Sequence, residues 1–175
     1  MSLKDRIQQM AGDSEEIHPD EFSNLILDDI KINQVNDEDK AYLNKFLNLE
    51  KLCMNSTGLT SLTNLPNELN KIARLELTDN SLEGSELPKL LVFAQTLLVL
   101  KIGNNKIQTI DEVKQLAGLT ELIQLDIQHN PITNVDNYRQ QILDAFPKLE
   151  VLDGKDRDGG DFSSNEDYGE EGEMD

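Results

Sequence analysis

The stretch "LLVLKIGNNKI" (residues 97–107) decides the fold, because its pattern recurs both before and after it in the chain. The pattern is L-x-x-L-x-L-x-x-N-x-L, with isoleucine accepted at the leucine positions. "IARLELTDNSL" (residues 72–82) and "LIQLDIQHNPI" (residues 122–132) match it throughout. Both intervals between these copies are 25 residues long, so the chain repeats one structural unit at a fixed period.

Weaker copies extend the repeat toward both ends of the chain. "LEKLCMNSTGL" begins at Leu49 and "FSNLILDDIKI" at Phe22, with Thr57 and Ile30 in the asparagine position. A truncated copy, "FPKLEV", begins at Phe146. Successive starts are separated by 23 to 27 residues, which is the period of leucine-rich repeats.

The alternation inside each copy predicts a short strand. In the copy that begins at Ile72, Leu75 and Leu77 point inward while Glu76 points outward. We expect a right-handed α/β leucine-rich-repeat solenoid with a curved parallel β-sheet on its concave face and helical or irregular returns on its convex face. A structural role, hydrogen-bonding the amides of the turns from inside, is expected for Asn80, Asn105 and Asn130.

The return segments carry helix signals. Thr109 followed by Glu112 predicts a capping box, and Asp136 is expected to cap the helix that follows it. Both ends of a solenoid expose a hydrophobic layer, so each needs a cap. We predict an N-terminal cap at residues 1–21, five leucine-rich repeats at 22–145, a C-terminal repeat cap at 146–158 and a disordered acidic tail at 159–175.

The segment "DGKDRDGGDF" (residues 153–162) resembles a calcium-binding loop only superficially. With Gly159 as the glycine of such a loop, its first position falls on Gly154 and its twelfth on Asn165, and neither is a carboxylate. No metal site and no cofactor are therefore expected. We expect Asp156, Arg157 and Asp158 to hold the cap by surface ion pairs.

The overall charge favours basic partners. The chain has 34 acidic and 16 basic residues and a net charge of −18, which would repel a phosphate backbone, so no direct contact with nucleic acid is expected. A single cysteine, Cys53, fits a reducing compartment. The sequence shows neither a signal peptide nor a run long enough to cross a bilayer, and we expect an intracellular monomer without membrane contact.

Four motifs resemble the acidic leucine-rich nuclear phosphoprotein 32 family: "HPDEFSNLILDD" from His18, "NSTGLTSLTNLP" from Asn55, "IARLELTDNSLEG" from Ile72 and "FPKLEVLDGKDRD" from Phe146. The resemblance covers roughly residues 18–160. It implies a non-enzymatic adaptor of the nucleus that also shuttles to the cytoplasm. Members of that family bind histones, shield them from acetylation, act as chromatin chaperones and inhibit protein phosphatase 2A.

The tail departs from the family pattern. Family tails are longer, nearly pure aspartate and glutamate, and end in a basic import cluster, whereas this one is short and interrupted by glycines. Either the chain is a truncated form or this member binds histones weakly. The resemblance implies phosphorylation by an acidophilic kinase at Ser163 and Ser164. The composition of the tail fits either a segment that only keeps the protein soluble or an arm that captures basic partners through Asp161, Glu166, Asp167, Glu170, Glu171 and Glu173.

Outward strand positions define the surface expected to bind a protein partner. The residues predicted for this concave face are Lys51, Arg74, Glu76, Asp79, Lys101, Asn104, Asp126 and Gln128. The sixth copy is expected to add Lys148 and Glu150 to the same rows. Family members read Asn-Asp at an exposed corner before the C-terminal cap, where this chain reads Asp136-Asn137, so contacts specific to that corner are in doubt.

No catalytic constellation is predicted. His129 lies near Asp126, but the candidate nucleophiles Ser56 and Cys53 are three repeats away, about 15 Å across stacked strands. Two binding hypotheses remain. The first is a chromatin regulator whose acidic tail attracts core histones while the concave face orients them. The second is a scaffold that grips one folded partner, such as a phosphatase subunit or a splicing component, through the concave face alone.

Overall fold

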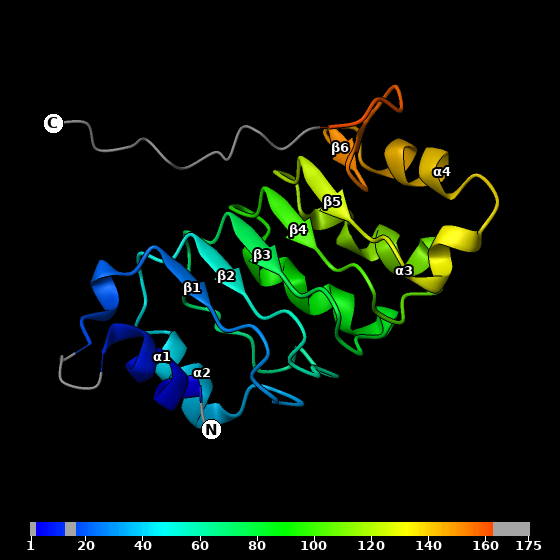
Figure 1. Cartoon of the computed structure of the whole chain (residues 1–175). Coiled ribbons are helices and arrows are strands. Elements are labelled where there is room, and N and C mark those ends of the chain that lie inside the picture. The colour runs from blue at the N-terminus through cyan, green and yellow to red at the C-terminus, as the bar shows by residue number, and fades with distance from the viewer. Residues whose placement is uncertain (1–2, 13–16, 163–175) are drawn as a thin grey trace, which may run out of the picture.

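The protein is a curved stack of short strands backed by helices, described in a computed structural model for residues 3–12 and 17–162. The first six strands pair in parallel in chain order, and the last is antiparallel to its neighbour. Figure 1 shows these strands side by side on one face and the helices behind them. The strands are β1 (Asn24–Ile26), β2 (Lys51–Cys53), β3 (Arg74–Glu76), β4 (Val99–Lys101), β5 (Gln124–Asp126), β6 (Val151–Leu152) and β7 (Lys155–Asp156).

The central leucine of each copy occupies the same register position. Leu75 pairs with Leu100, and Leu100 with Leu125, so the three lie on successive rungs as the repeat predicts. The whole ladder is fully shielded from solvent and consists of Leu25, Leu52, Leu75, Leu100, Leu125 and Leu152. The leucine-rich-repeat fold class is therefore confirmed.

The register of the sixth copy corrects the sequence alignment. Leu125 pairs with Leu152, so this copy begins at Leu149 and not at Phe146. Lys148 and Glu150 consequently precede the strand and do not join the concave rows. The alignment was wrong because leucines at both 149 and 152 fit the pattern, and only strand pairing distinguishes them.

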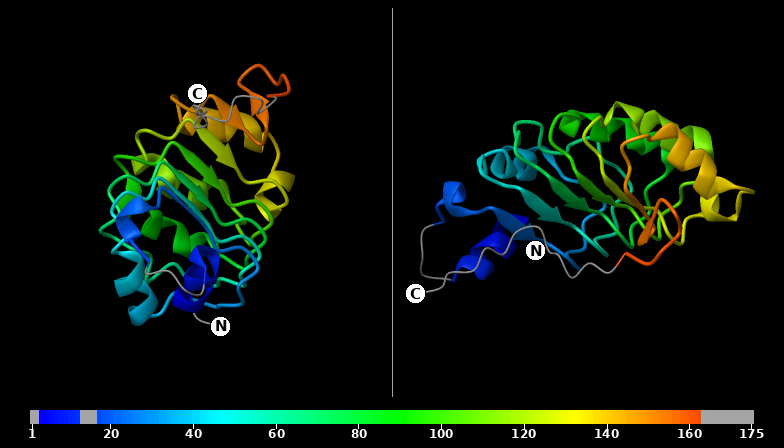
Figure 2. Two further views of the ribbon diagram at one scale, coloured as in Figure 1. Left: turned by 60° about the vertical axis from the view of Figure 1, so that its left-hand side comes forward. Right: turned by 90° about the horizontal axis from the view of Figure 1, so that it is seen from above.

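The returns on the convex side are short helices of mixed type, which Figure 2 shows behind the sheet along its length. Residues 54–73, between β2 and β3, contain no helix, and Pro66, which disfavours a long helix, lies within this return. The helical elements are α1 (Leu3–Ala11), η1 (Pro19–Glu21), α2 (Asp37–Leu43), η2 (Gly84–Phe93), α3 (Ile110–Lys114), η3 (Gln115–Gly118), η4 (Pro131–Asn134) and α4 (Tyr138–Ala145).

One predicted cap is confirmed and one is wrong. Thr109 Oγ1 accepts the Glu112 amide at 3.2 Å, and Glu112 Oε2 accepts the Thr109 amide at 2.9 Å, which completes the capping box of α3. Asp136, in contrast, does not cap α4. Asn137 occupies that position with φ of 57°, in the left-handed region, and forms no side-chain cap. The left-handed conformation suits asparagine, whose short polar side chain tolerates it better than most.

The repeat asparagines occupy the predicted inward positions. Asn80 Oδ1 accepts the amides of Thr57 and Leu59, and its Nδ2 donates to carbonyl oxygens of Met54 and Leu77. Asn130 binds the Ile107 amide and two carbonyl oxygens in the same way. Their structural role, bonding turn amides from inside, is confirmed.

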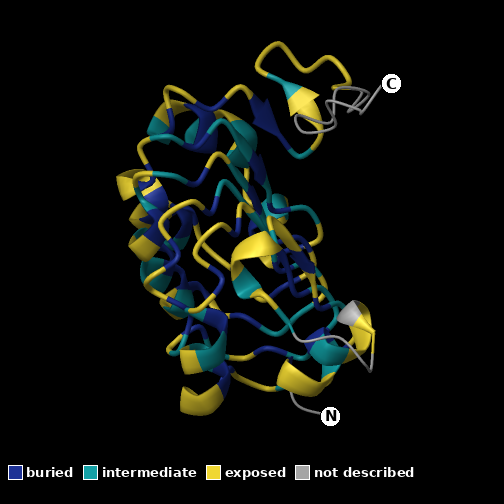
Figure 3. Ribbon diagram, turned by 90° about the vertical axis from the view of Figure 1, so that its left-hand side faces the viewer, coloured by how far each residue is buried: buried dark blue, intermediate teal, exposed yellow. Residues whose placement is uncertain are grey.

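Both ends of the stack are covered by elements that bury apolar side chains. At the N-terminal end α1 contributes Leu3 and Ile7, which are fully buried in the core. Figure 3 shows the buried residues, in dark blue, inside the stack and the exposed residues, in yellow, on its outer turns and helices. At the C-terminal end Gly154, with φ of 73°, makes the turn between β6 and β7. The boundaries given above for caps, repeats and tail stay a prediction.

Charged residues of the C-terminal cap act through the backbone rather than through ion pairs. Arg157 Nη1 donates to the Leu149 carbonyl at 2.7 Å, and Asp156 Oδ1 accepts the amides of Asp158 and Gly160. The predicted ion pairs among these residues are therefore wrong. Backbone carbonyl and amide groups at the end of the solenoid have no next repeat to bond to, so they need side-chain partners, whereas exposed charges are solvated by water. In the part of the chain described, no helix is long and apolar enough to cross a bilayer.

Candidate functional site

The outward side chains of β2 to β5 form two rows on the concave face. One row is Lys51, Arg74, Val99 and Gln124, and the next is Cys53, Glu76, Lys101 and Asp126. Each strand of these four contributes one residue to each row because successive residues in a strand point to opposite faces. The face therefore carries both signs of charge within a few ångströms.

Glu76 lies at the centre of a charged cluster on this face. Arg74 Nε donates to Glu76 Oε1 at 2.6 Å, and Lys101 Nζ lies 3.6 Å from the same oxygen. Burial alone would raise the pKa of Glu76, but the Arg74 hydrogen bond and the two positive charges outweigh it and lower that pKa. The structure thus joins three of the predicted face residues into one network that holds Glu76 ionised at neutral pH.

The other predicted face residues form separate contacts. Asn104 Nδ2 donates to Asp79 Oδ1 at 2.5 Å, at two exposed positions with positive φ. Asp126 Oδ1 accepts the Gln128 amide at 3.0 Å. Lys51 forms no ion pair or hydrogen bond through its side chain with any of the described residues. It is thus the predicted basic residue most available to a partner.

Asp28 and Asn55, which the outward register also places on the concave face, join this surface through hydrogen bonds. Asn55 donates to Glu76 Oε2 at 3.4 Å and accepts the Thr78 amide at 2.8 Å, while Asp28 accepts the Asn55 amide. Both residues occupy an outward position of their repeat, three residues after its central leucine. Polar residues at that position hydrogen-bond the backbone of neighbouring turns, and they also contribute polar groups to the concave face.

Asp153 takes the place in the second row that was assigned to Glu150. Its Oδ1 accepts the Ile127 amide at 2.8 Å and its Oδ2 accepts the Tyr138 hydroxyl at 2.6 Å. Burial raises the pKa of Asp153 above its ordinary value, although both hydrogen bonds oppose that shift. Burial and the Asp153 carboxylate likewise raise the pKa of Tyr138. The pair ties α4 to the end of β6.

The remaining predicted sites lie away from the concave rows. Asp136 and Asn137 are exposed at the start of α4, at the outer corner of the molecule. Asp161 pairs with Lys155 Nζ at 3.0 Å. The other tail residues proposed for binding or phosphorylation lie outside the described residues: Ser163, Ser164, Glu166, Asp167, Glu170, Glu171 and Glu173.

Cys53 and His129, two of the residues considered for catalysis, are not placed to react together. Burial raises the pKa of the Cys53 thiol to about 11, with Glu76 adding to the effect, so the thiol stays protonated and unreactive. Two strands, β3 and β4, separate it from His129. Residues 3–12 and 17–162 contain no group of three or more metal-ligating side chains placed to hold an ion.

Relatives of known name match most of this chain. It is 34% identical over 146 residues to an acidic leucine-rich nuclear phosphoprotein 32-related protein of Plasmodium falciparum, covering 83% of this chain and 52% of the relative. It is 32% identical over 155 residues to a histone of Tetrahymena thermophila, covering 89% of this chain and 39% of that relative. The chain thus spans about half or less of the length of these relatives. No family profile matches it.

Solved structures share the fold. A chain of the Drosophila melanogaster SNF/U2A′ complex superposes with a TM-score of 0.61 at 24% identity, covering 77% of this chain and 74% of that one. A chain of the Chaetomium Mex67:Mtr2 subunits gives a TM-score of 0.51 at 14% identity, covering 89% and 92%.

The repeating strands, the asparagine positions and these superpositions define a leucine-rich-repeat protein. Proteins of this kind are typically non-catalytic. Within that class the chain is related to the acidic leucine-rich nuclear phosphoprotein 32 proteins, as the sequence motifs predicted.

Proposed function

We propose that the protein is a non-enzymatic nuclear adaptor for basic proteins, with core histones as its first partners. The observation that carries the proposal is the excess of 34 acidic over 16 basic residues on a scaffold that offers a protein-binding surface. Lysine-rich surfaces are attracted to such a charge over long range. Two relatives support the choice of a nuclear, histone-linked partner: one is named as related to a nuclear phosphoprotein and the other is named a histone.

In this proposal the tail attracts the basic partner, and the concave face orients it. Residues 163–175 contain six acidic side chains and no basic one. On the face, Lys51 and the Arg74–Glu76–Lys101 network present fixed charges of both signs, which favours a defined protein surface over a phosphate backbone. Phosphorylation at Ser163 or Ser164 would add negative charge to the tail and strengthen the attraction.

The test measures binding of purified core histones to the full chain at increasing salt, and to a chain lacking residues 163–175. We expect affinity to fall steeply with salt, and the truncation to weaken binding by roughly tenfold because it removes long-range attraction. The cut must follow Phe162, because Asp153 and Arg157 belong to the folded cap. Binding that is indifferent to both salt and truncation would contradict the proposal.

The second candidate is a scaffold that grips one folded partner, including protein phosphatase 2A, through the concave face. The ordered Arg74–Glu76–Lys101 network favours it, because fixed side chains lose little entropy on binding. Lys51→Glu separates the candidates. It would abolish a grip through the concave face, whereas Lys114→Glu, a matched charge reversal on exposed α3, would not. Equal effects of the two reversals would point to net charge alone, and so to the first candidate.

A further inference from the structure

The two ends of the sheet are finished differently. At the C-terminal end β7 pairs with β6, and Lys155 makes a further bridge with Asp161. At the other end β1 pairs only with β2. Ile26 of β1 is 48% exposed, whereas Cys53, its register partner in β2, is 3% exposed. β1 is therefore an open edge of the sheet.

The backbone of β1 has polar groups left over at this edge. Ser23 O accepts the Lys51 amide, and Leu27 N donates to Cys53 O, so these residues face β2. Alternation in a parallel strand turns the amides and carbonyls of Asn24, Ile26 and Asp28 the other way. No described residue hydrogen-bonds to those outward groups. An unpaired row of this kind is a template for a further strand.

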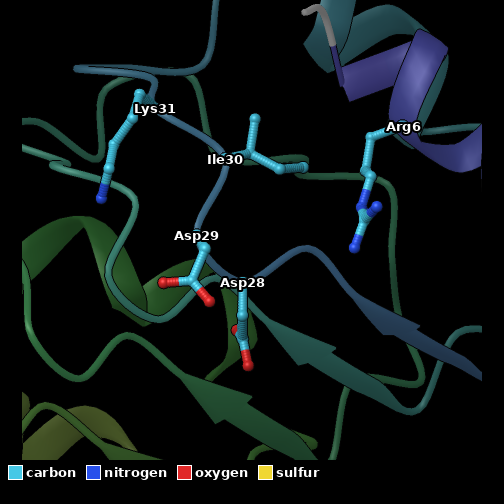
Figure 4. A pocket seen from close by; sticks show the side chains of 5 residues that line it. All are labelled: Arg6, Asp28, Asp29, Ile30 and Lys31. Atoms are coloured by element: carbon cyan, nitrogen blue, oxygen red, sulfur yellow. The ribbon is translucent and has the colours of Figure 1, made fainter.

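A hollow of about 390 Å³ lies where β1 ends, lined by Arg6, Asp28, Asp29, Ile30 and Lys31. Figure 4 shows the carboxylates of Asp28 and Asp29 side by side, with Arg6 of α1 on the far side of the hollow. Lys31 is already engaged, because its Nζ donates to Ser56 O at 2.7 Å. Arg6 Nε is buried from solvent and has no hydrogen-bond partner among the described residues.

We propose that the outer edge of β1 binds an extended segment of a basic protein as an added strand, an inference that rests on the proposed preference for basic partners. The free backbone groups of Asn24, Ile26 and Asp28 supply the hydrogen bonds, and Ile26 supplies an apolar contact. Acidic residues flank the edge at both ends, Asp28 and Asp29 at one and η1 at the other. A basic side chain entering the hollow pairs with the Asp29 carboxylate, because both oxygens of Asp28 already accept hydrogen bonds from Asn55.

The same charges argue against a second copy of this chain at the edge. Two β1 strands placed side by side would bring the flanking carboxylates of both copies together, and like charges at that distance repel. The chemistry of the edge therefore selects a partner of opposite charge.

Amide hydrogen exchange of the full chain tests the binding mode. The probe is a short synthetic peptide that alternates lysine with valine, and its glutamate counterpart is the control. With the lysine peptide, the outward amides of Asn24, Ile26 and Asp28 gain protection while those of Leu25 and Leu27, already bonded to β2, stay unchanged. The glutamate peptide leaves all five amides unchanged.

A proline substitution tests the backbone contact. Asn24→Pro removes an outward N–H and no bond to β2, as an edge strand permits, and we expect it to weaken peptide binding roughly tenfold. Asn24→Ala keeps the amide and serves as the matched control, with unchanged affinity. Melting temperatures of both variants establish that the fold is intact. Asp29→Asn, at a left-handed position that asparagine tolerates, should weaken binding and flatten its salt dependence.

The outcomes separate this inference from the proposed function. Protection that appears on β2 to β5 instead of β1, or equal affinities for the proline and alanine variants, overturns the edge proposal while histone binding stands. Failure to bind both the peptide and core histones overturns both. A dimer of the free chain that Asn24→Pro dissociates would assign the edge to a second copy and overturn the proposal.

Discussion

Asn105 holds together two repeats with a single side chain. Its Oδ1 accepts the Leu82 amide at 3.0 Å, and its Nδ2 donates to the Leu77 and Ile102 carbonyls, both at 3.0 Å. The side chain is only 6% exposed, so water cannot replace these bonds if it is removed. Buried backbone groups left without partners cost more than the bonds themselves contribute.

Asn105→Ala should lower the free energy of unfolding by about 2–4 kcal/mol, because it leaves an amide and two carbonyls in the core without their hydrogen-bond partner. Asn70→Ala is the matched control, since Asn70 is exposed and makes no side-chain hydrogen bond to a described residue. The control should change stability by less than about 0.5 kcal/mol. Urea denaturation of both variants measures the difference, and equal losses would refute a special role for the repeat asparagine.

At the scale of elements, the contact between α4 and β6 depends on Tyr138 and Asp153. The Asp153 pKa is raised above its ordinary value mainly by burial, so the ionised carboxylate opposes folding. The contribution of this group to stability is full below the unfolded pKa of 3.8 and is lost as the pH rises through the folded value. The Tyr138 hydrogen bond limits that loss by stabilising the ionised form.

Tyr138→Phe should therefore destabilise the protein by about 1–2 kcal/mol at neutral pH and by less in mild acid, because a protonated Asp153 needs the bond less. Chemical denaturation of variant and parent across that pH range measures the difference. Tyr42→Phe is the control, since the Tyr42 hydroxyl donates to no described carboxylate. A destabilisation that does not change with pH would contradict the assigned coupling.

At the scale of the whole molecule, net charge opposes the compact state. The chain carries −18 at neutral pH, and the ion pairs among residues 3–12 and 17–162, such as the exposed Lys148–Glu121 pair, are too weak to offset the repulsion. Stability therefore depends on the continuous leucine core along the stack, with both ends covered.

Added sodium chloride should raise the melting temperature, because screening weakens the repulsion within the folded state. Thermal melts at low and physiological ionic strength measure the effect. It should shrink as the pH is lowered toward the pI of about 4.3, where the net charge vanishes. A melting temperature that falls with salt at neutral pH would show that specific ion pairs, and not net repulsion, dominate.

The sequence predicts which residues of the site point outward from the strands, but it does not predict which of their side chains bond to one another. Outward positions such as Arg74, Glu76 and Lys101 follow from the period of two in a strand. Whether these three side chains form one network depends on which atoms come within bonding distance across neighbouring strands. The sixth copy shows the limit most clearly, since Lys148 and Glu150 fitted the local pattern yet strand pairing moved Asp153 into the row.

The sequence by itself determined the repeat, its period and the inward leucines and asparagines, because each follows from local spacing. The resemblance of its motifs indicated the relationship to acidic leucine-rich nuclear phosphoproteins. Only the tertiary structure decided where the stack ends. It turned Arg157 onto backbone carbonyls, paired β7 with β6 and left β1 open. Local patterns specify what each repeat buries, but the groups left unpaired at a sheet edge depend on what the rest of the chain brings beside them.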